Sequence, residues 1–573
     1  MDREHVAQAL SEIAALLELT GESPFRIRAY QAAARSIADY PGDLREARAQ
    51  GILARRKGLG PATLEIVEDL LDTGRSRALE DLRDQVPPGL GDLLKIGGLG
   101  VAKVRTIHEN LRVDSLEELE SAARDGRLAR LPRFGPKTAE RVLRGIAFLR
   151  RQAGMLLVHH ARRDADVVGA ALAGVPGVDH VAVAGSMRRR CELVRDLDFV
   201  LVTTAPAERL LDAVRRLTGV AEAGRVAPDG LQLRLESGAV VDTYLTPPER
   251  FGLALLHATG SAAHLEQLAA RAGARGMQWS RTDLAGAQET AQLAHEKDVY
   301  RALGLPWIPP ELREGAGEVE AADAGRLPTL VEPRDLRGFL HCHSDYSDGA
   351  NTVAQWADAA AAAGYGYLGI TDHSPATAFG GGLQPEEVSR QHAEMDAENG
   401  RRHGIRLLKG VEADILADGS LDYTPDLRSR FDFIIASVHS RHGMSADDMT
   451  ARVLKAMDDP TMTILGHPTG RLLLSRDPYP MDLDAVFARA AARGVAIEIN
   501  ADPQRLDLDW RLLQRARRAG VTISVGADAH GTAQLHHMEF GIGIARKGWL
   551  GADAVLNTRS AEEFLAFAAR RRP

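Results

Sequence analysis

Seven short apolar runs follow one another between about residue 337 and residue 573, and six of them carry a potential metal ligand, His, Asp or Glu, at or just after the end of the expected strand. They alternate with helical stretches and read GFLHCH, YLGITDH, LLKGVEAD, FIIASVH, TILGHP, VAIEIN and TISVGADAH. Apolar runs of this length between helices predict parallel strands, and seven such units predict a closed β/α barrel. The polar side chains at the strand ends would then lie together at one end of the barrel.

The strand ends predict a cluster of metal ligands. Residues i and i+2 of a strand face the same side, so His341 and His343 point into one space, as do Asp528 and His530. Barrel active sites lie at the carboxyl ends of the strands, where nine candidate ligands would meet. These are His341, His343, Asp348, His373, Glu412, His439, His467, Asp528 and His530.

The mixture of imidazole and carboxylate donors suits Mn²⁺, Zn²⁺ or Fe. Adjacent ions suit hydrolysis of phosphoesters, because one supplies hydroxide while the others neutralise the phosphate and the leaving oxygen. A single histidine is more often a surface or supporting residue, but nine potential ligands in register favour a metal centre.

Length and composition set the class of protein. A chain of 573 residues is too long for one hydrophobic core and predicts several domains. No apolar run approaches the roughly 18 residues that span a bilayer, and the N-terminus lacks the pattern of a signal peptide. The two cysteines, Cys191 and Cys342, cannot form a disulfide framework. We therefore expect a cytoplasmic protein with no membrane partner.

Residues 1 to 150 carry 24 Lys and Arg against 23 Asp and Glu, so the net charge of −8 arises in the rest of the chain. Short amphipathic helices are expected at Pro24–Ala38, Pro61–Leu71, Val101–Leu111 and Pro136–Leu149. Glycine turns precede three of them, and such turns can hold a phosphate on backbone N–H groups. Glycine turns also occur where helices merely pack together, but three such turns in one small helical region favour DNA binding. The candidate contacts are Gly58, Gly60, Gly98, Gly100, Lys103, Gly135 and Lys137.

The centre of the chain predicts a second metal site on a mixed α/β sheet. Asp196 and Asp198 face one side of a predicted strand, and Asp242 lies on a later one. Three carboxylates can hold two Mg²⁺ or Mn²⁺ ions, the number that nucleotidyl transfer uses. The preceding Gly185 and Ser186, with Arg189, could bind triphosphate oxygens. A lone D-x-D pair is common in loops and calcium sites, whereas this pair after Gly-Ser is more specific.

These motifs resemble two known families. The motifs H-x-H, T-D-H, S-V-H, G-H-P and D-x-H over 337–573 are similar to the PHP (polymerase and histidinol phosphatase) domain. The Gly-Ser turn, the three aspartates and the T-G-S turn that contains Gly260 resemble the palm of family X DNA polymerases. The segment SPFRIRAYQAAARSIADYP resembles that family's amino-terminal domain, which implies that Arg26, Arg28 and Tyr30 grip a 5′-phosphate.

The resemblance covers the whole chain and implies a multidomain fold. We expect an α-helical region with helix-hairpin-helix motifs, an α/β nucleotidyltransferase palm with a thumb, and a distorted seven-unit β/α PHP barrel. The expected domains are a DNA-end-binding domain (1–85), fingers (86–150), palm (151–245), thumb (246–312), linker (313–335) and PHP domain (336–573).

The resemblance implies a monomeric repair polymerase associated with the nucleoid. It would fill short gaps with dNTPs, with Asp196, Asp198 and Asp242 as catalytic metal ligands and Ser186, Arg189 and Gly260 at the triphosphate. Its substrate would be gapped or nicked DNA and its 3′ ends. The PHP domain would hold three metal ions and act as a 3′-5′ exonuclease and 3′-phosphatase, and could also cut abasic sites.

Several residues depart from the family pattern. Arg195 stands where the family commonly has glycine, and His257 and Ala258 stand where it has aromatic residues. The helix at 262–268, where polar or basic residues of the family usually contact the nascent base pair, reads AAHLEQL. These departures motivate an alternative, a DNA 3′-end nuclease or phosphatase with impaired polymerisation. Ile66 stands where some members have a lyase lysine, so no lyase activity is expected through that position, and Lys57 is a speculative substitute.

Two further readings compete with an enzyme that acts on DNA through both sites. A DNA-end scaffold would leave twelve ligand positions without use. A small-molecule phosphatase would suit the barrel but would give residues 1 to 310 no purpose.

Overall fold

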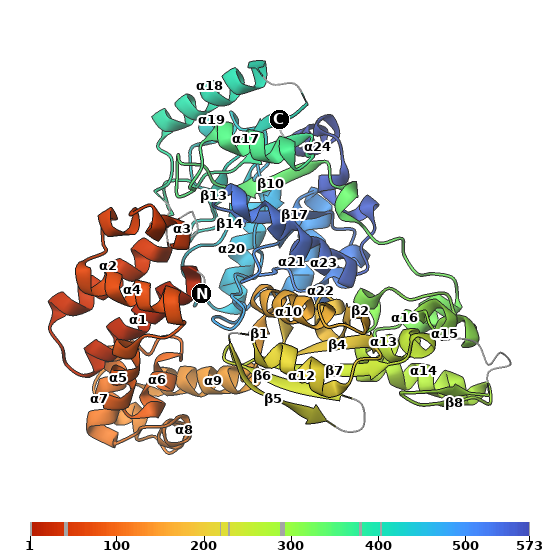
Figure 1. Ribbon diagram of the computed structural model, residues 1–573. Coiled ribbons are helices and arrows are strands. Elements are labelled where there is room, and N and C mark those ends of the chain that lie inside the picture. Colours follow the sequence, from red (N-terminus) through yellow and green to blue (C-terminus); the bar gives the residue numbers. More distant parts are fainter. Residues whose placement is uncertain are drawn as a thin grey trace. The chain divides into compact units, whose positions relative to one another are not determined.

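The computed structural model describes residues 3–38, 40, 44–217, 219–226, 230–286, 293–377, 381–401 and 404–571. The chain divides into two compact units, Met1–Ala153 and Gly154–Pro573 (Figure 1). A membrane-spanning helix is not found in the described part of the chain.

The first unit is built of helices around one apolar cluster, so the two domains expected at 1–85 and 86–150 form one compact body. The helices predicted at Pro24–Ala38 and Val101–Leu111 have those bounds, and the other two extend by a few residues. The α-helices are α1 (Arg3–Leu19), α2 (Pro24–Ala38), α3 (Leu44–Ala49), α4 (Pro61–Thr73), α5 (Arg77–Gln85), α6 (Pro88–Leu94), α7 (Val101–Leu111), α8 (Leu116–Arg124) and α9 (Pro136–Gln152).

The second unit begins with a five-stranded mixed sheet, called here the central sheet. Its strand order is β2-β4-β7-β6-β5, and only the β4–β7 pair is parallel. The strands are β2 (Val178–Val183), β4 (Asp196–Thr203), β5 (Val220–Val226), β6 (Gly230–Leu235) and β7 (Val240–Thr246), and the helices are α10 (Val158–Ala173), α11 (Gly185–Arg188) and α12 (Ala207–Arg215). A small pair, β1 (Leu156–Leu157) and β3 (Leu193–Val194), lies beside it.

The two faces of the central sheet differ because side chains alternate along a strand. Leu197, Phe199 and Leu201 of β4 face α10 and α12 and form the apolar core. Asp196 and Asp198 therefore project from the opposite face, where Val200 packs on Leu255 of α13 (Phe251–Thr259). The acidic residues of the predicted site thus share one face.

Helices after the sheet form a separate apolar cluster, called here the adjoining helices. They comprise α13, α14 (Ala262–Ala274), α15 (Glu296–Ala302) and α16 (Glu318–Asp323), with the small pair β8 (Gln278–Trp279) and β9 (Leu284–Ala285). The structure differs here from the linker expected at 313–335. Val319 and Ala322 of α16 are buried in this cluster, so the segment is folded despite its weak periodicity.

The C-terminal part is a parallel barrel. Its strands are β10 (Gly338–Cys342), β11 (Tyr367–Ile370), β12 (Arg406–Lys409), β13 (Glu412–Asp414), β14 (Ile435–Ser437), β15 (Ile464–Leu465), β16 (Ala496–Asn500) and β17 (Ile523–Ala529). β12 and β13 are two halves of one strand, since only Gly410 and Val411 separate them and they pair with β11 and β14 respectively. Seven parallel strands therefore close the barrel, as the sequence predicts.

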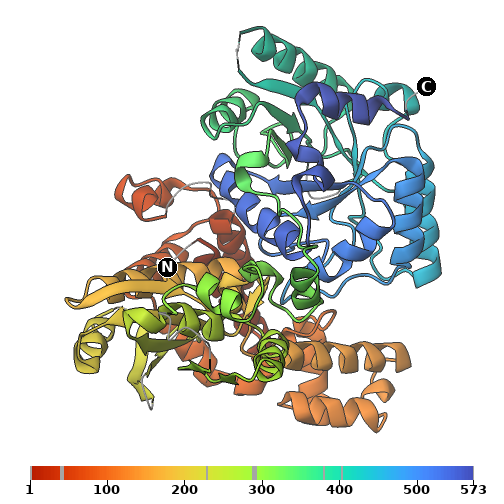
Figure 2. The ribbon, with the colours of Figure 1, turned by 90° about the vertical axis from the view of Figure 1, so that its right-hand side faces the viewer.

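Helices surround the strands, and one helix covers the end of the barrel at which the strands begin (Figures 1 and 2). Phe564 of α24 (Ala561–Ala569) packs against Leu340, Tyr367 and Phe433 in the barrel interior. The opposite end, where the strands finish, is left for polar side chains. The other helices are α17 (Val353–Ala362), α18 (Pro385–Arg401), α19 (Pro425–Arg428), α20 (Ala446–Asp458), α21 (Leu483–Arg493), α22 (Trp510–Arg518) and α23 (Met538–Lys547).

Candidate metal centres

The three aspartates of the central sheet lie together. Asp198 and Asp242 are register partners in the parallel β4–β7 pair, and Asp196 faces the same side two residues earlier on β4. Burial, followed by the charges of Asp196 and Asp242, raises the pKa of Asp198 to about 7. The side chain of Gln232 donates to Asp242 at 2.8 Å. Carboxylates brought together in this way have the chemistry that divalent cations prefer.

Gly185 is required by close contact with the acidic cluster. Its φ is +61°, and a Cβ added there would lie 1.9 Å from an oxygen of Asp198. The next residue, Ser186, has a buried hydroxyl without a hydrogen-bond partner in the described part of the chain. A buried hydroxyl without a partner is able to form a hydrogen bond to a polar ligand that binds at this turn.

The turn Thr259, Gly260 and Ser261 lies against the arginines that follow Ser186. The guanidinium of Arg189 donates to the Thr259 carbonyl at 2.8 Å. Arg188 donates to the carboxylate of Glu296 at 2.7 and 2.9 Å. The structure therefore brings the predicted Gly260 and Arg189 to one edge of the acidic face.

The unusual helix Ala262–Leu268 has a structural explanation at one position. His264 is fully buried, with its Nδ1 2.6 Å from Glu318 and its Nε2 2.9 Å from the Tyr300 hydroxyl. It joins α14 to α15 and α16, so its side chain holds the adjoining helices together.

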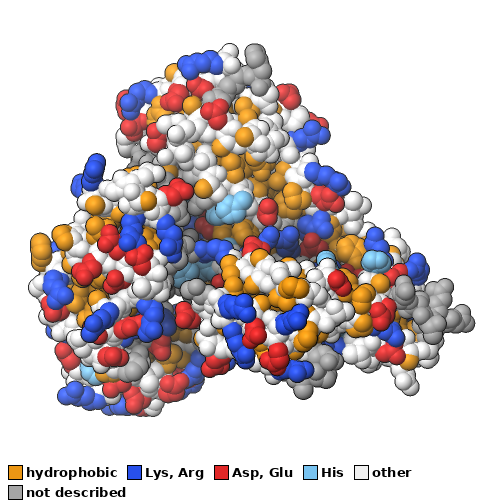
Figure 3. All heavy atoms as spheres, viewed as in Figure 1, with side chains coloured by type: hydrophobic (Ala, Val, Ile, Leu, Met, Phe, Trp, Pro, Cys, Tyr) orange, Lys and Arg blue, Asp and Glu red, His pale blue; other side chains and the backbone are white. Residues whose placement is uncertain are grey.

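All nine predicted ligands of the barrel converge at the carboxyl ends of its strands. Potential ligand atoms form three groups, within each of which all atoms lie within 4.8 Å of one another. The groups are His343, Asp348, His373 and His530; His341, His343, Glu412 and Asp528; and His373, Glu412 and His439. The ninth residue, His467, has its Nε2 2.9 Å from Glu412. In Figure 3, histidine side chains reach the surface over β13 and β14.

Glu412 lies at the centre of the cluster and belongs to two of the three groups. Burial alone would raise its pKa, but His439, His341 and His373 hold the pKa of Glu412 well below its ordinary value. A fully buried carboxylate shared in this way can bridge two cations. Three overlapping groups of potential metal ligands thus lie next to one another.

The donor set fits metal ions rather than a closed hydrogen-bond network. The Nε2 of His341 and the Nδ1 of His343 are buried and have no hydrogen-bond partner among the described residues. Buried polar atoms normally find partners, so these two nitrogens fit the role of metal ligands. Non-glycine residues with positive φ also occur here, at His341 (64°) and Asp528 (50°). Such backbone strain is concentrated at functional sites.

The sequence prediction missed the residue that orients the ligands from behind. Glu498 lies on β16, the one predicted strand that ends without a ligand, and its carboxylate is buried. His341 Nδ1 lies 2.6 Å from it, and the His467 backbone N–H donates to it at 2.7 Å. A carboxylate in the apolar run VAIEIN was the available signal, since a buried charge needs a partner.

Asp414 supports the opposite side of the cluster in the same way. Its carboxylate lies 3.2 Å from the Nδ1 of His439 and accepts a hydrogen bond from Thr377 at 2.6 Å. Partners of this kind fix the orientation of a ligating imidazole.

The glycine turns of the first unit behave alike. Gly60, Gly100 and Gly135 are the N-cap residues of α4, α7 and α9. The residue two before each N-cap has positive φ, namely Gly58, Gly98 and, in the third turn, Arg133 (68°). Arg133 therefore adopts the backbone conformation of the glycine that it replaces.

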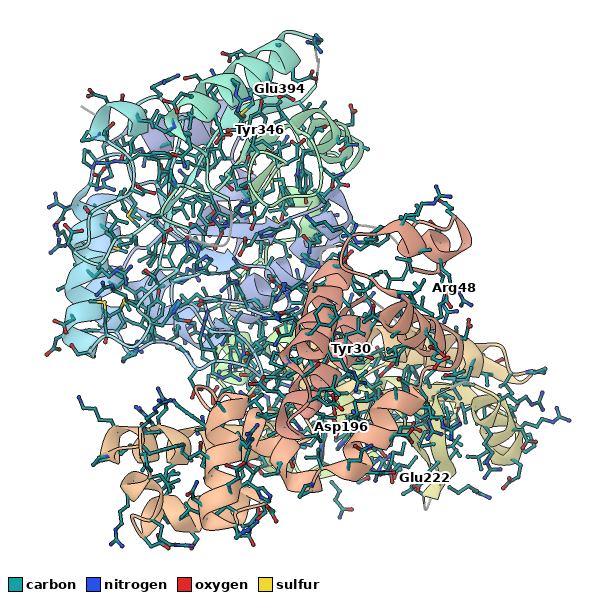
Figure 4. The ribbon with its side chains drawn as sticks, turned by 90° about the vertical axis from the view of Figure 1, so that its left-hand side faces the viewer. Tyr30, Arg48, Asp196, Glu222, Tyr346 and Glu394 are labelled. Carbon is teal, nitrogen blue, oxygen red and sulfur yellow. The ribbon has the colours of Figure 1, made fainter. Side chains whose placement is uncertain are left out.

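The side chains predicted to contact DNA are not all exposed. Arg28 and Lys137 are exposed, but Tyr30 is only 8% exposed and packs in the helical core (Figure 4). Arg26 forms an ion pair with Glu22 at 3.0 Å, and Lys103 donates to the Gly98 carbonyl of its own turn at 3.0 Å. Tyr30 thus belongs to the core, because it lies on the face of α2 that carries the buried residues Ile27 and Ala34.

Comparison with protein families matches four segments. Residues 1–76 match a helix-hairpin-helix domain, and residues 90–147 match a SAM-like helix-hairpin-helix tandem. Residues 254–314 match the DNA polymerase beta thumb, and residues 340–502 match the PHP domain.

Individual relatives extend over the whole chain or over the barrel. The chain is 34% identical over 576 residues to the DNA polymerase/3′-5′ exonuclease PolX of Bacillus subtilis (strain 168), with 100% of both chains covered. It is 30% identical over 201 residues to a "probable phosphatase" of Clostridium acetobutylicum, covering 33% of this chain and 78% of that protein. A similar "probable phosphatase" of Thermoanaerobacter sp. (strain X514) is 30% identical over 165 residues, covering 27% of this chain and 65% of that protein.

The role of Glu498 predicts the effect of removing its charge. Glu498→Gln should weaken metal binding by the barrel by about 10- to 100-fold, since His341 loses the carboxylate that orients it. Metal content after dialysis against graded chelator measures this.

Glu394→Gln is the matched control, because Glu394 accepts a hydrogen bond from Tyr346 at 2.8 Å outside the nine-residue cluster (Figure 4). Its metal content should equal that of the parent. Equal metal retention by the Glu498 and Glu394 variants would contradict the role given to Glu498.

Proposed function

The chain belongs to the family X DNA polymerases that carry a C-terminal PHP domain, and we propose that it fills short gaps in DNA and trims 3′ ends during repair. It is a DNA polymerase joined to a metal-dependent phosphoesterase with 3′-5′ exonuclease activity, as its full-length relative is named. The observation that carries the proposal is the presence of two separate acidic or histidine clusters on one chain with helix-hairpin-helix motifs. Its substrate would place it at the nucleoid.

We propose that the central sheet performs nucleotidyl transfer. Asp196, Asp198 and Asp242 would hold two Mg²⁺ or Mn²⁺ ions, which when bound acidify a 3′-hydroxyl and neutralise a triphosphate. Asp242 would take the proton of the hydroxyl, and its register with Asp198 supports this role.

The triphosphate of an incoming dNTP would rest on the turn that begins at Gly185. The bare backbone of Gly185 allows a phosphate to approach the acidic face, and the free hydroxyl of Ser186 can donate to it. Arg189 supplies a fixed positive charge that is 14% exposed, and Gly260 supplies backbone from the opposite turn.

We propose that the barrel cleaves phosphoesters at DNA 3′ ends. The nine converging residues would hold Mn²⁺, Zn²⁺ or Fe, up to three ions, which when bound supply hydroxide and neutralise the phosphate. Glu498 and Asp414 keep the ligating imidazoles in one orientation, so that they need not reorganise when substrate binds. Abasic-site cleavage and 3′-phosphatase activity require the same chemistry.

The helix-hairpin-helix turns would hold the DNA backbone without reading its sequence. Their glycine N-caps at Gly60, Gly100 and Gly135 open helix ends to phosphate. Exposed Arg28 and Lys137 would add electrostatic attraction. Ile66 is buried at 4% exposure, which supports the expectation that this position has no lyase role.

The alternative of impaired polymerisation rests on the altered helix at 262–268. Burial of His264 between α14, α15 and α16 supports retained activity, because that departure serves packing. The register of the three aspartates supports the same reading.

Separate knockouts test the two assignments. Asp198→Ala should lower nucleotide incorporation on a one-nucleotide gap at least about a thousandfold and leave 3′-end digestion within about twofold. His343→Ala should do the reverse. Both activities are measured on the same gapped duplex.

Asp179→Ala is the matched control for the sheet, because Asp179 is exposed on β2. Synthesis that survives Asp198→Ala would refute the polymerase site, and digestion that survives His343→Ala would refute the barrel site.

The raised pKa of Asp198 predicts a pH dependence. Below a pKa of about 7 a proton competes with the cation for this carboxylate, and above it the carboxylate is free. Half-maximal incorporation should therefore need about tenfold more Mg²⁺ at pH 6 than at pH 8. Magnesium titrations of gap filling measure this, and equal requirements at both pH values would contradict it.

A further inference from the structure

Helix α23 lies between a barrel strand that carries a predicted metal ligand and the arginines that follow Ser186. It follows β17, which carries Asp528, and packs against that strand. Its last residue, Lys547, is fully buried. A buried ammonium is costly unless it is paired, so the partners of Lys547 report a specific arrangement.

The hydrogen-bond partners of Lys547 lie outside the barrel. Its Nζ donates to the carboxylate of Glu314, in the segment beside the adjoining helices, and to the backbone carbonyl of Arg189 at 3.1 Å. The ammonium also lies 4.5 Å from the ring centroid of Trp510. The barrel thus places a positive charge directly against the proposed triphosphate turn.

Glu314 is shared between two cations. Besides Lys547, it accepts a hydrogen bond from the Nε of Arg189 at 2.9 Å. Burial alone would raise its pKa, but the charges of Lys547 and Arg189 hold the pKa of Glu314 below its ordinary value. An ionised carboxylate therefore lies between Lys547 and the arginine proposed to bind triphosphate.

Further contacts seat the same turn on the barrel. A Cβ added at Gly543 of α23 would lie 3.3 Å from the side chain of Arg190. Glu192 accepts hydrogen bonds from Trp510 at 3.2 Å and from Arg511 at 2.6 Å. The turn that follows Ser186 is therefore held from both ends by barrel residues.

From these contacts we infer that the barrel contributes a positioning residue to the polymerase site. Lys547 sets the position of Arg189 by binding its backbone carbonyl. Because Lys547 also pairs with Glu314, it weakens the attraction between the Glu314 carboxylate and the Arg189 guanidinium. This inference rests on the proposed function, since it gives Arg189 a role at the triphosphate.

Loss of the ammonium has a defined consequence. Without Lys547, the partly buried carboxylate of Glu314 has Arg189 as its remaining cationic partner and binds it more strongly. The arginine is then withheld from the triphosphate, and its carbonyl loses an anchor. Neutralising Glu314 in the same molecule removes the competition, so the second change should reverse much of the first.

Gap filling by Lys547→Met and by the double variant Lys547→Met/Glu314→Gln tests the inference. In full-length protein, Lys547→Met should raise KM for dNTP about tenfold with kcat within about threefold, because a charge-assisted contact to the nucleotide is weakened. The double variant should return KM to within about threefold of the parent. Digestion of 3′ ends, measured on each preparation, should stay within about twofold.

Lys455→Met is the matched control, because Lys455, on α20 of the same barrel, forms an exposed ion pair with Asp418. It should leave KM unchanged. An unchanged KM in Lys547→Met, or a higher KM in the double variant than in the single one, would overturn the inference.

Misfolding is recognised by loss of 3′-end digestion. If Lys547→Met misfolds, the double variant, which has neither buried charge, is compared with the parent, and a KM more than about tenfold above the parent's overturns the inference. An inactive parent enzyme would refute the proposed function itself, whereas an active parent with an unaffected Lys547→Met variant refutes only the role of Lys547.

Discussion

The carboxylate of Glu412, buried among imidazoles at the end of the barrel, is the constraint on which the C-terminal half depends. Three histidines hold its pKa well below the ordinary value, and two histidine nitrogens nearby have no hydrogen-bond partner among the described residues. So many titratable groups are costly to bury unless cations bind them. The barrel brings them together because each strand ends at the same rim, and α24 fills the other end with Phe564. The architecture therefore serves the cluster.

The central sheet also brings acidic side chains together, but it does so with three aspartates. Alternation along β4 sends Leu197 and Phe199 to the core and Asp198 to the opposite face, where Asp242 meets it in register. Gly185 is bare because the carboxylate of Asp198 occupies the space of a side chain. One chain thus carries two acidic centres, of which one would join phosphoesters and the other would cleave them. Lys547 and Glu314 give these centres a physical connection.

Local patterns were enough to predict much of this. The apolar runs predicted seven strands, and the residues at their ends, together with Asp348 in the loop after the first strand, predicted the nine converging side chains, since strand direction fixes where ends meet. The sequence did not identify residues whose role depends on partners that are distant along the chain. Glu498 matters only because His341 and His467 meet it, Lys547 only because Glu314 lies opposite, and Tyr30 is buried by packing that its basic neighbours do not reveal. Residues 313–335 show no helical periodicity because α16 is short. The helix is fixed partly by the contact of Glu318 with His264, which an apolar periodicity does not reveal.

Anomalous diffraction from crystals of the full-length protein grown with Mn²⁺ would test the central claim most directly. The account predicts strong peaks enclosed by His343, Glu412 and Asp528 and by the other two ligand groups around them. Manganese bound beside Asp198 and at surface carboxylates, with no peak at the rim of the barrel, would contradict it.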